Sequence, residues 1–259
     1  MYKTLNQNKV KLMIGKEQYA LEWNSSAQYF YDHKSYKHLA THIQQFKTVL
    51  EIGCGTGQST LALLEAGHCV IAIEQNSYCI EMAKRLIKSS GYEIKDSVDD
   101  LTPKSVCFIE MDVTTLKFEF EVLSKISPDV VVCWNVGTYW DEEKCEDAFG
   151  KMLEYGLSAE YISANTESSY GELIIWRSCV IAKAKACAVQ IVERTMEKVN
   201  KLNNDKFYAF LKEELHFSAI KYANLKAATL SQGGRMLIAN GKVRRQKEMP
   251  IYLVSILLT

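Results

Sequence analysis

Three glycines at alternate positions are the residues of this sequence whose spacing most clearly suggests chemistry. They are Gly53, Gly55 and Gly57, and they lie in "TVLEIGCGTGQST" (48–60), directly after a short apolar run. Three of the 13 glycines of the chain lie in this segment. A glycine turn between a strand and a helix brings bare backbone N–H groups and a helix N-terminus close to a ligand. The turn therefore predicts a site for an anionic or nucleotide-like ligand.

The spacing of the glycines separates the families that use such a turn. The dinucleotide fingerprint G-x-G-x-x-G, as in a dehydrogenase, would require a third glycine at position 58, where this chain has Gln58. The phosphate-binding P-loop would require a lysine that the segment lacks. The pattern present is E-x-G-x-G-x-G, starting at Glu51. In the form "VLEIGCGTG", it resembles motif I of the class I S-adenosylmethionine-dependent methyltransferases.

This resemblance implies S-adenosyl-L-methionine as the cofactor and a Rossmann-like methyltransferase fold. That fold is a seven-stranded, mostly parallel, doubly wound sheet with an antiparallel C-terminal hairpin and helical lid elements. The cofactor-binding residues that it implies are Glu51, Gly53, Cys54, Gly55, Thr56, Gly57, Glu74, Gln75, Asp112, Val113 and Asn135.

Two carboxylates end the next predicted strands. Glu74 follows "VIAI", and a carboxylate there can accept both ribose hydroxyls. By resemblance, Asp112 in "FIEMDVTTL" accepts from the adenine amino group, with the backbone N–H of Val113 on the ring. Each carboxylate could instead cap the helix that follows it. A non-catalytic module that binds the cofactor would share these features.

Residues beyond the fourth predicted strand are the candidates for contact with substrate. "PDVVVCWNVGTYW" (128–140) resembles motif IV, and Asn135 is expected to meet the methionine part of the cofactor or the nucleophile. Trp134, Tyr139 and Trp140 are predicted to form an aromatic wall at the substrate, or only to cap the sheet. No base is unambiguous. We take Tyr170 and Glu172, with Asn135, as candidate catalytic residues and Glu167 as a candidate substrate contact, while His33 and His38 stay open.

Short apolar runs alternate with amphipathic segments, which favours a parallel sheet covered on both faces. The predicted strands span 48–53, 69–74, 106–111, 129–134, 160–165, 235–240 and 251–258, with the last two forming a hairpin. Residues 168–199 and 206–230 are predicted to be mainly helical, although "FSAIKYANL" (217–225) could be a strand. We therefore divide the chain into an N-terminal helical lid (1–45) and a catalytic domain (46–259) with a helical insertion or cap at 168–230.

The composition of the chain bears on which class of molecule accepts the methyl group. Lys plus Arg equals Asp plus Glu at 31 each, which gives no basic footprint for a nucleic-acid binder. We therefore expect an N or O nucleophile of a small molecule, with nucleic acid and protein or peptide as alternatives. The eight cysteines lack metal-ligand spacing and fit a reducing cytoplasm, so no metal is expected. No segment resembles a membrane span or signal peptide, and a homodimer is possible through the helix that begins near residue 168.

Overall fold

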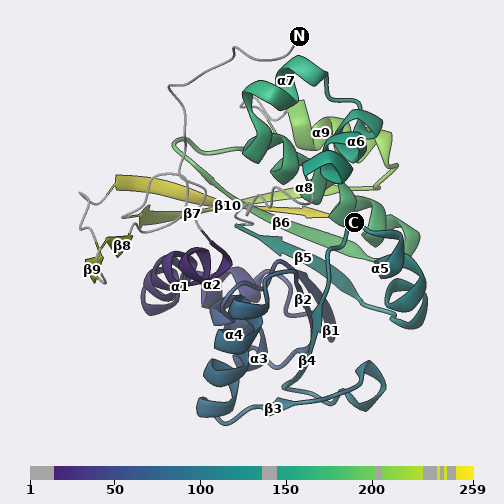
Figure 1. Cartoon of the computed structure of the whole chain (residues 1–259). Helices are drawn as coiled ribbons and strands as arrows, with labels where there is room; N and C mark the ends of the chain where they lie inside the picture. The colour runs from purple at the N-terminus through teal and green to yellow at the C-terminus, as the bar shows by residue number, and fades with distance from the viewer. Residues whose placement is uncertain (1–14, 136–144, 202–205, 230–237, 240–241, 244–248) are drawn as a thin grey trace.

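A mostly parallel eight-stranded sheet forms the centre of the computed structural model, in the order β3-β4-β2-β1-β5-β6-β10-β7 (Figure 1). The structure describes residues 15–135, 145–201, 206–229, 238–239, 242–243 and 249–259. Strands β1 to β6 pair in parallel, and β10 is antiparallel to both β6 and β7. The chain proceeds outward from β1 in both directions, so the strand order reverses between β1 and β5. Ligands of open α/β sheets bind at such a point.

The strands of the main sheet are β1 (Thr48–Ile52), β2 (Cys69–Glu74), β3 (Glu93–Ile94), β4 (Ser105–Glu110), β5 (Val130–Trp134), β6 (Ala188–Thr195), β7 (Ile220–Thr229) and β10 (Met249–Leu258). A separate antiparallel pair consists of β8 (Ile238–Ala239) and β9 (Lys242–Val243). The helices are α1 (Lys16–Asp32), α2 (Ser35–Thr41), α3 (Gln58–Glu65), α4 (Ser77–Ser89), α5 (Leu116–Glu121), α6 (Cys145–Tyr155), α7 (Ala159–Ala164), α8 (Thr166–Ala184) and α9 (Lys206–Glu214). Short 3-10 turns lie at Val98–Asp100 and Leu123–Lys125.

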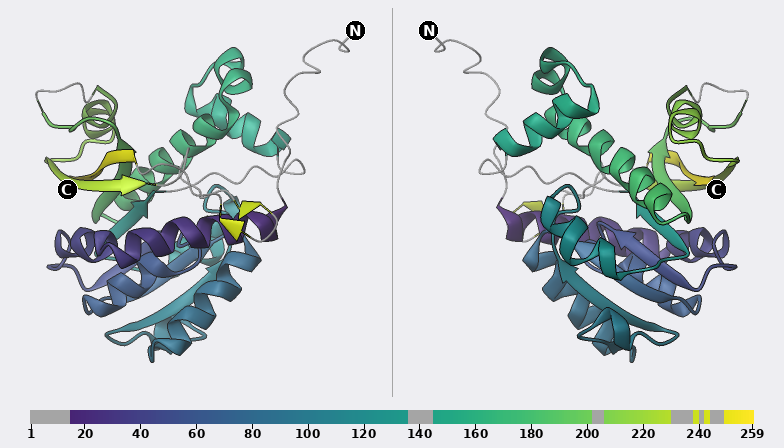
Figure 2. Two further views of the ribbon diagram at one scale, coloured as in Figure 1. Left: turned by 90° about the vertical axis from the view of Figure 1, so that its left-hand side faces the viewer. Right: turned by 90° about the vertical axis from the view of Figure 1, so that its right-hand side faces the viewer.

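Two apolar layers, one on each face of the sheet, hold the helices in place. Helices α1 to α4 share one buried cluster with the sheet, and α5 to α9 share the other (Figure 2). The side chains of strand β5 pack alternately into the two clusters. Val130, Val132 and Trp134 belong to the first cluster, and Val131 and Cys133 belong to the second. Alternation of this kind explains why the strand is apolar at every position.

The predicted fold class is confirmed: the sheet is mostly parallel, doubly wound and closed by an antiparallel C-terminal pair. The predicted strands at 48–53, 69–74, 106–111, 129–134 and 251–258 correspond to β1, β2, β4, β5 and β10. The sheet has eight strands instead of the predicted seven; β3, a two-residue edge strand, and β6 are strands that the sequence analysis did not predict.

The predicted strand at 160–165 is wrong, because this segment forms α7. The Ser158 hydroxyl accepts a hydrogen bond from the backbone N–H of Tyr161 at 3.1 Å and caps the helix. Ile162 is buried, whereas its neighbour Tyr161 is exposed, so the segment buries a single side chain of its one and a half turns.

The prediction that 168–230 is helical is also wrong in part. Helix α8 ends at Ala184, and the chain then turns through Ala186, whose φ is 50°, into β6. Residues 220–229 form β7, so the alternative interpretation of "FSAIKYANL" as a strand is the better one. The partner of β10 is therefore β7 and not the segment 235–240, of which only Ile238–Ala239 is described, in the separate small sheet.

None of the helices in the described part of the chain is long and apolar enough to cross a membrane.

Candidate cofactor and acceptor site

The glycine turn connects β1 to α3 at the point where the strand order reverses. Gly53, Gly55 and Gly57 have φ values of 74°, 54° and 94°, a region that residues with a Cβ rarely adopt. A Cβ at Gly55 would lie 2.1 Å from the indole nitrogen of Trp23 in α1, and one at Gly57 would lie 2.8 Å from the Cβ of Ala83 in α4. Both the backbone conformation and the close packing of two helices therefore require glycine here.

Glu51 lies behind this turn rather than in front of it. Its carboxylate is buried and accepts hydrogen bonds from Ser59 Oγ at 2.5 Å and Thr60 Oγ1 at 2.6 Å, both in α3. Burial raises the pKa of Glu51 to about 7, although the two hydroxyl donors lower it in part. The carboxyl group thus fastens the first turn of α3 to β1, and it is not among the residues that line the neighbouring cleft.

Glu74, at the end of β2, fastens the glycine turn from the other side. Its Oε2 accepts from the backbone N–H of Gly55 at 3.0 Å, and its Oε1 accepts from that of Asn76 at 2.9 Å. Burial raises the pKa of this carboxyl group, and the backbone N–H groups of Asn76, Gly55 and Gln75 oppose that rise. Unlike Glu51, Glu74 lines the cleft, so its carboxylate is within reach of a ligand.

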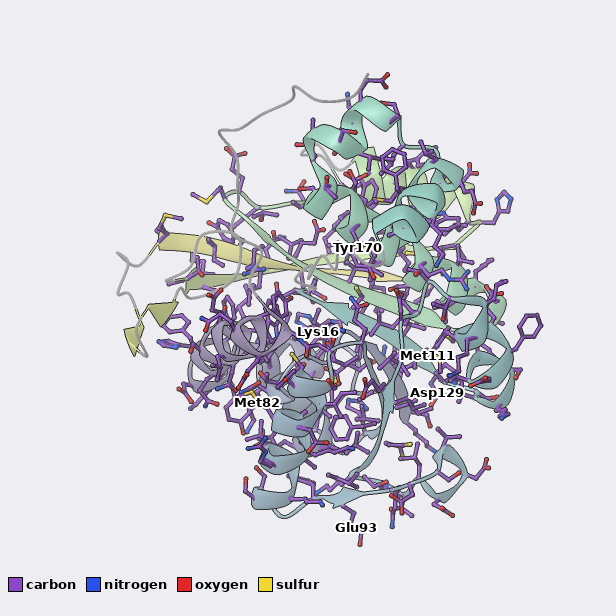
Figure 3. All side chains as sticks on the ribbon, in the orientation of Figure 1. Lys16, Met82, Glu93, Met111, Asp129 and Tyr170 are labelled. Atoms are coloured by element: carbon purple, nitrogen blue, oxygen red, sulfur yellow. The ribbon has the colours of Figure 1, made fainter. Side chains whose placement is uncertain are left out.

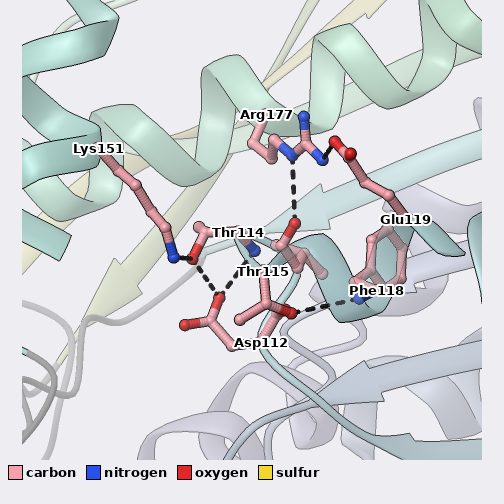
Figure 4. A network of polar contacts seen from close by, with 8 residues as sticks. Asp112, Thr114, Thr115, Phe118, Glu119, Lys151 and Arg177 are labelled. Atoms are coloured by element: carbon pink, nitrogen blue, oxygen red, sulfur yellow. Dashed lines mark hydrogen bonds and ion pairs between the residues drawn. The ribbon is translucent and has the colours of Figure 1, made fainter. Parts of the chain in front are cut away.

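Asp112 lies in a loop after β4 that several elements hold in place (Figure 4). Its Oδ1 accepts from the backbone N–H and the hydroxyl of Thr114, both at 2.8 Å. Arg177 of α8 donates from Nε to the carbonyl oxygen of Val113 at 3.2 Å and pairs with Glu119 of α5. Asp112 and Val113 are therefore positioned by contacts from α5 and α8 as well as by their own loop.

A cleft with about 380 Å³ of empty space lies in front of these groups. Gly53, Glu74, Gln75, Asp112, Val113 and Tyr170 are among the residues that line it. Tyr170 belongs to α8 (Figure 3). Its hydroxyl lies 3.4 Å from Asp112 Oδ2 and accepts from Gln75 Nε2 at 3.5 Å. The cleft thus brings together residues from the ends of β1, β2 and β4, as the sequence analysis predicts for a nucleoside site.

Asn135 follows β5 directly, and its buried side-chain amide lacks hydrogen-bond partners. It is 4% exposed, its φ is 50°, and neither the oxygen nor the nitrogen of its side-chain amide has a hydrogen-bond partner. Its backbone N–H donates to the carbonyl oxygen of Val192 in β6 at 2.9 Å. Buried amides without partners are costly, and backbone strain of this kind gathers at functional sites.

The other predicted site residues differ in where they lie. Cys54 and Thr56 are buried within the glycine turn. Trp134 is buried against α2, where its ring stacks on Tyr36 at 6.2 Å between ring centroids and its indole N–H donates to Gln190, so it caps the sheet. Glu172 accepts from the hydroxyl of Tyr161 on the surface of α7, away from the cleft. This placement gives no support to the predicted catalytic role of Glu172. Tyr139, Trp140 and the side chain of Glu167 lie outside the described residues.

Several contacts at the site were missed by the sequence analysis because they join segments far apart in the chain. Asn76 donates from Nδ2 to the carbonyl oxygen of Lys16 at 2.9 Å, and Gln58 donates from Nε2 to Asn24 at 2.8 Å. Both tie α1 to the loops that carry the cleft residues. The sequence held one signal, the polar and aromatic character of residues 1–47, but nothing in it paired these residues with the loops. Groups of three or more His, Cys, Asp or Glu side chains able to hold a metal are absent from the described residues.

Comparison with known proteins identifies a domain within the chain. Residues 49–155 match the family described as "Methyltransferase domain". A stretch of 92 residues is 27% identical to a mitochondrial ribosomal RNA small subunit methyltransferase from Arabidopsis thaliana, covering 36% of this chain and 24% of that protein. The chain thus spans about a quarter of the length of that curated relative.

Solved structures of similar shape have low sequence identity. Magnesium protoporphyrin IX methyltransferase from Synechocystis, with its cofactor bound, matches with a TM-score of 0.46 and 12% identity over 94% of this chain and 86% of that one. An RNA methyltransferase described as putative, from Pyrococcus horikoshii, matches with a TM-score of 0.47 and 12% identity over 91% and 84% of the two chains.

The residues matched by the family include the glycine turn, Glu74, Asp112 and Asn135. These residues belong to a sheet whose strand order reverses between β1 and β5, where open α/β sheets bind ligands. Residues 49–155 therefore carry a methyltransferase domain, which agrees with the predicted class I S-adenosylmethionine-dependent methyltransferase and with S-adenosylmethionine as its cofactor.

Proposed function

We propose that this methyltransferase transfers the methyl group to a nitrogen or oxygen nucleophile of a small molecule that enters the fold between α1 and α8. The observation that carries the proposal is the side-chain amide of Asn135, which is 4% exposed and without a partner at the end of β5. An acceptor group must penetrate the fold to reach it, and the equal number of acidic and basic residues offers no surface to attract a phosphate backbone.

The residues of the cleft suit the cofactor. We assign Glu74 to the ribose hydroxyls, Asp112 and Val113 to the adenine ring, and the turn from Gly53 to Gly57 to the amino-acid end. The partly buried carboxylates of Glu74 and Asp112 support this assignment, because both line the cleft beside the glycine turn. Gln75 donates to Tyr170 across the cleft and belongs to the same group. Bound S-adenosylmethionine supplies a methyl group already activated by the positive charge on its sulfur.

The protein then has to orient the acceptor and exclude water. We assign the orienting role to Asn135, whose amide oxygen can accept a hydrogen bond from an N–H or O–H nucleophile. Tyr170 is a poor candidate for a base, because burial and the nearby carboxylate of Asp112 raise its pKa well above its usual range. A phenol that stays protonated at neutral pH can donate to Asp112 but cannot remove a proton. We therefore move Tyr170 from the catalytic to the cofactor-binding residues of the proposal.

We propose that α1 and α2, within the segment 1–45, act as the lid over the site. The contacts of α1 support this role. Trp23 lies against Gly55, the carbonyl oxygen of Lys16 accepts from Asn76, and Asn24 accepts from Gln58. These three contacts reach the glycine turn and the loop after Glu74, so a bound cofactor and the position of α1 depend on the same residues.

The experiment is a methyl-transfer assay with three separate acceptor pools and a common readout. Purified protein receives methyl-labelled S-adenosylmethionine together with a small-metabolite extract, total RNA, or a peptide digest, and S-adenosylhomocysteine and labelled products are quantified. Product formation with the metabolite pool alone supports the proposal. Transfer of label mainly to RNA or to peptides would replace it with one of the alternatives.

A further inference from the structure

Arg194, near the end of β6, is a partly buried cation with no assigned purpose in the cofactor site. Its Nη1 atom is shielded from solvent and has no hydrogen-bond partner. Because the backbone N–H of Asn135 donates to Val192, Arg194 lies two residues further along β6, at the same edge of the sheet as Asn135. A cation with an unused donor thus lies at the same edge of the sheet as the predicted acceptor end of the site.

The surroundings of Arg194 are aromatic rather than acidic. Like Val192, it belongs to the face of the sheet that α1 and α2 cover, and the phenols of Tyr36 and Tyr19 are its closest titratable neighbours on that face. Glu193, the next residue, is directed to the opposite face, where it adds to the effect of burial in raising the pKa of Tyr208, and its charge also raises the pKa of Arg194. Across the residues that the structure describes, no carboxylate forms an ion pair with Arg194.

An arginine in this setting reduces the stability of the fold. Partial burial lowers the pKa of Arg194, because it removes part of the water that would stabilise the charge. Buried cations are normally paired, and an unpaired one is costly because its desolvation is not offset by a counter-ion. A ligand that brings a negative group to the guanidinium offsets this cost, and the planar fork of arginine suits an oxyanion in particular.

We propose that Arg194 determines acceptor specificity and that the methyl acceptor is a small molecule bearing an oxyanion, such as a carboxylate or a phosphate. The oxyanion pairs with Nη1 of Arg194 while the nucleophile of the same molecule reaches the amide of Asn135. This inference rests on the proposed function, because it gives the chemical class of the small acceptor. It uses two independent observations, the unpartnered guanidinium nitrogen and the unpartnered amide, at one edge of the sheet.

The test measures binding instead of turnover and uses matched probes. Benzoate, phenyl phosphate and the neutral isostere benzamide are titrated by calorimetry into protein saturated with S-adenosylhomocysteine. Arg194→Gln and Arg194→Lys are compared with wild type, and Lys226→Gln serves as the control, since it removes an exposed cation of β7. Dissociation constants for S-adenosylhomocysteine and circular dichroism spectra report whether each variant folds.

We expect at least one of the two anions to bind wild type and Lys226→Gln more tightly than benzamide does. Arg194→Gln should bind that anion about 10- to 100-fold more weakly, because a charge-assisted hydrogen bond is lost, while its affinity for S-adenosylhomocysteine is unchanged. The anion that binds more tightly identifies the oxyanion. Equal binding of benzamide and both anions to wild type overturns the inference, as does failure of all three to bind, or unchanged anion affinity in a folded Arg194→Gln.

If both Arg194 variants fail to fold, the binding of the anions and of benzamide to wild type still tests whether the acceptor site prefers an oxyanion. The proposed function fails by a different result, the absence of methyl transfer to any small molecule. Anion binding without transfer and transfer to neutral acceptors are therefore distinguishable outcomes.

Discussion

Replacing Glu51 with Gln tests whether this carboxyl group holds the glycine turn from behind. Glu51 is 1% exposed, and both of its oxygens accept from hydroxyls of α3. A Gln side chain has nearly the same shape, and Ser59 and Thr60 can each donate or accept, so the amide can satisfy both hydroxyls. The main change is the loss of a group that ionises in the core.

The pKa of Glu51 determines the size and the pH dependence of the expected stability difference between Glu51→Gln and wild type. Because the pKa in the folded protein exceeds its ordinary value of 4.5 and reaches about 7, the fold favours the protonated carboxyl. The resulting contribution to stability is complete below pH 4.5 and is lost as the pH rises through 7. A rise in pKa of that size corresponds to about 3 kcal/mol of free energy once the group is ionised. Glu51→Gln removes this dependence, so its advantage over wild type should grow with pH.

The assay is urea unfolding of wild type and Glu51→Gln at a series of pH values from 4.5 to 8. We expect the two proteins to be similar at the acidic end and Glu51→Gln to be more stable by about 3 kcal/mol at pH 8. Glu110→Gln, which removes an exposed carboxylate at the end of β4, should show no such divergence. Since Glu51 does not line the cleft, the affinity of Glu51→Gln for S-adenosylmethionine should stay within a few-fold of wild type.

Two results would refute this reasoning. A stability difference that is the same at every pH would show that Glu51 is not a buried, ionisable group in the folded protein. A large loss of cofactor affinity in a stable Glu51→Gln would show that the carboxylate contacts the cofactor directly, as the resemblance to motif I implies.

Three further predictions concern the cleft, the glycine turn and the acceptor end. Glu74→Gln should weaken S-adenosylmethionine binding about 10- to 100-fold by calorimetry, because charged hydrogen bonds to the ribose are lost; affinity equal to that of the Glu110→Gln control would contradict the ribose assignment. Gly55→Ala should lower the free energy of unfolding by at least about 1–2 kcal/mol from its φ of 54° alone. Adding Trp23→Ala should then cost Gly55→Ala less than it costs wild type, since the new Cβ would lie 2.1 Å from the indole; strictly additive effects would exclude the clash. Asn135→Ala should reduce kcat about 100-fold through lost orientation while changing the dissociation constant of S-adenosylmethionine little, and the opposite pattern would assign Asn135 to the cofactor.

The first half of the fold was predictable because its signals are local. Each of β1, β2, β4 and β5 is a short apolar run; Glu74 is the last residue of β2, and Asp112 lies two residues after β4. Since parallel strands end at a common edge, the positions of these residues in the sequence predict their proximity in space. The cleft that they line agrees with that prediction.

The second half was less predictable because its boundaries carry no local signal. The change from α8 to β6 occurs within one nearly continuous apolar stretch, and Ala186 takes the positive φ of the turn without a glycine or proline to mark it. The contacts of α1 and α8 with the cleft depend on packing across long separations, such as Asn76 with Lys16 and Tyr170 with Asp112. The unpartnered groups of Asn135 and Arg194 can be recognised only when their surroundings are known.

The most direct test of the account is the mass balance of methyl transfer from isotopically labelled S-adenosylmethionine in the presence of a fractionated small-molecule extract. We predict that S-adenosylhomocysteine forms in step with one labelled product of low molecular mass, and that both form about 100-fold more slowly in Asn135→Ala while cofactor binding persists. Label recovered in RNA or protein, or product formation unaffected by Asn135→Ala, would contradict the account.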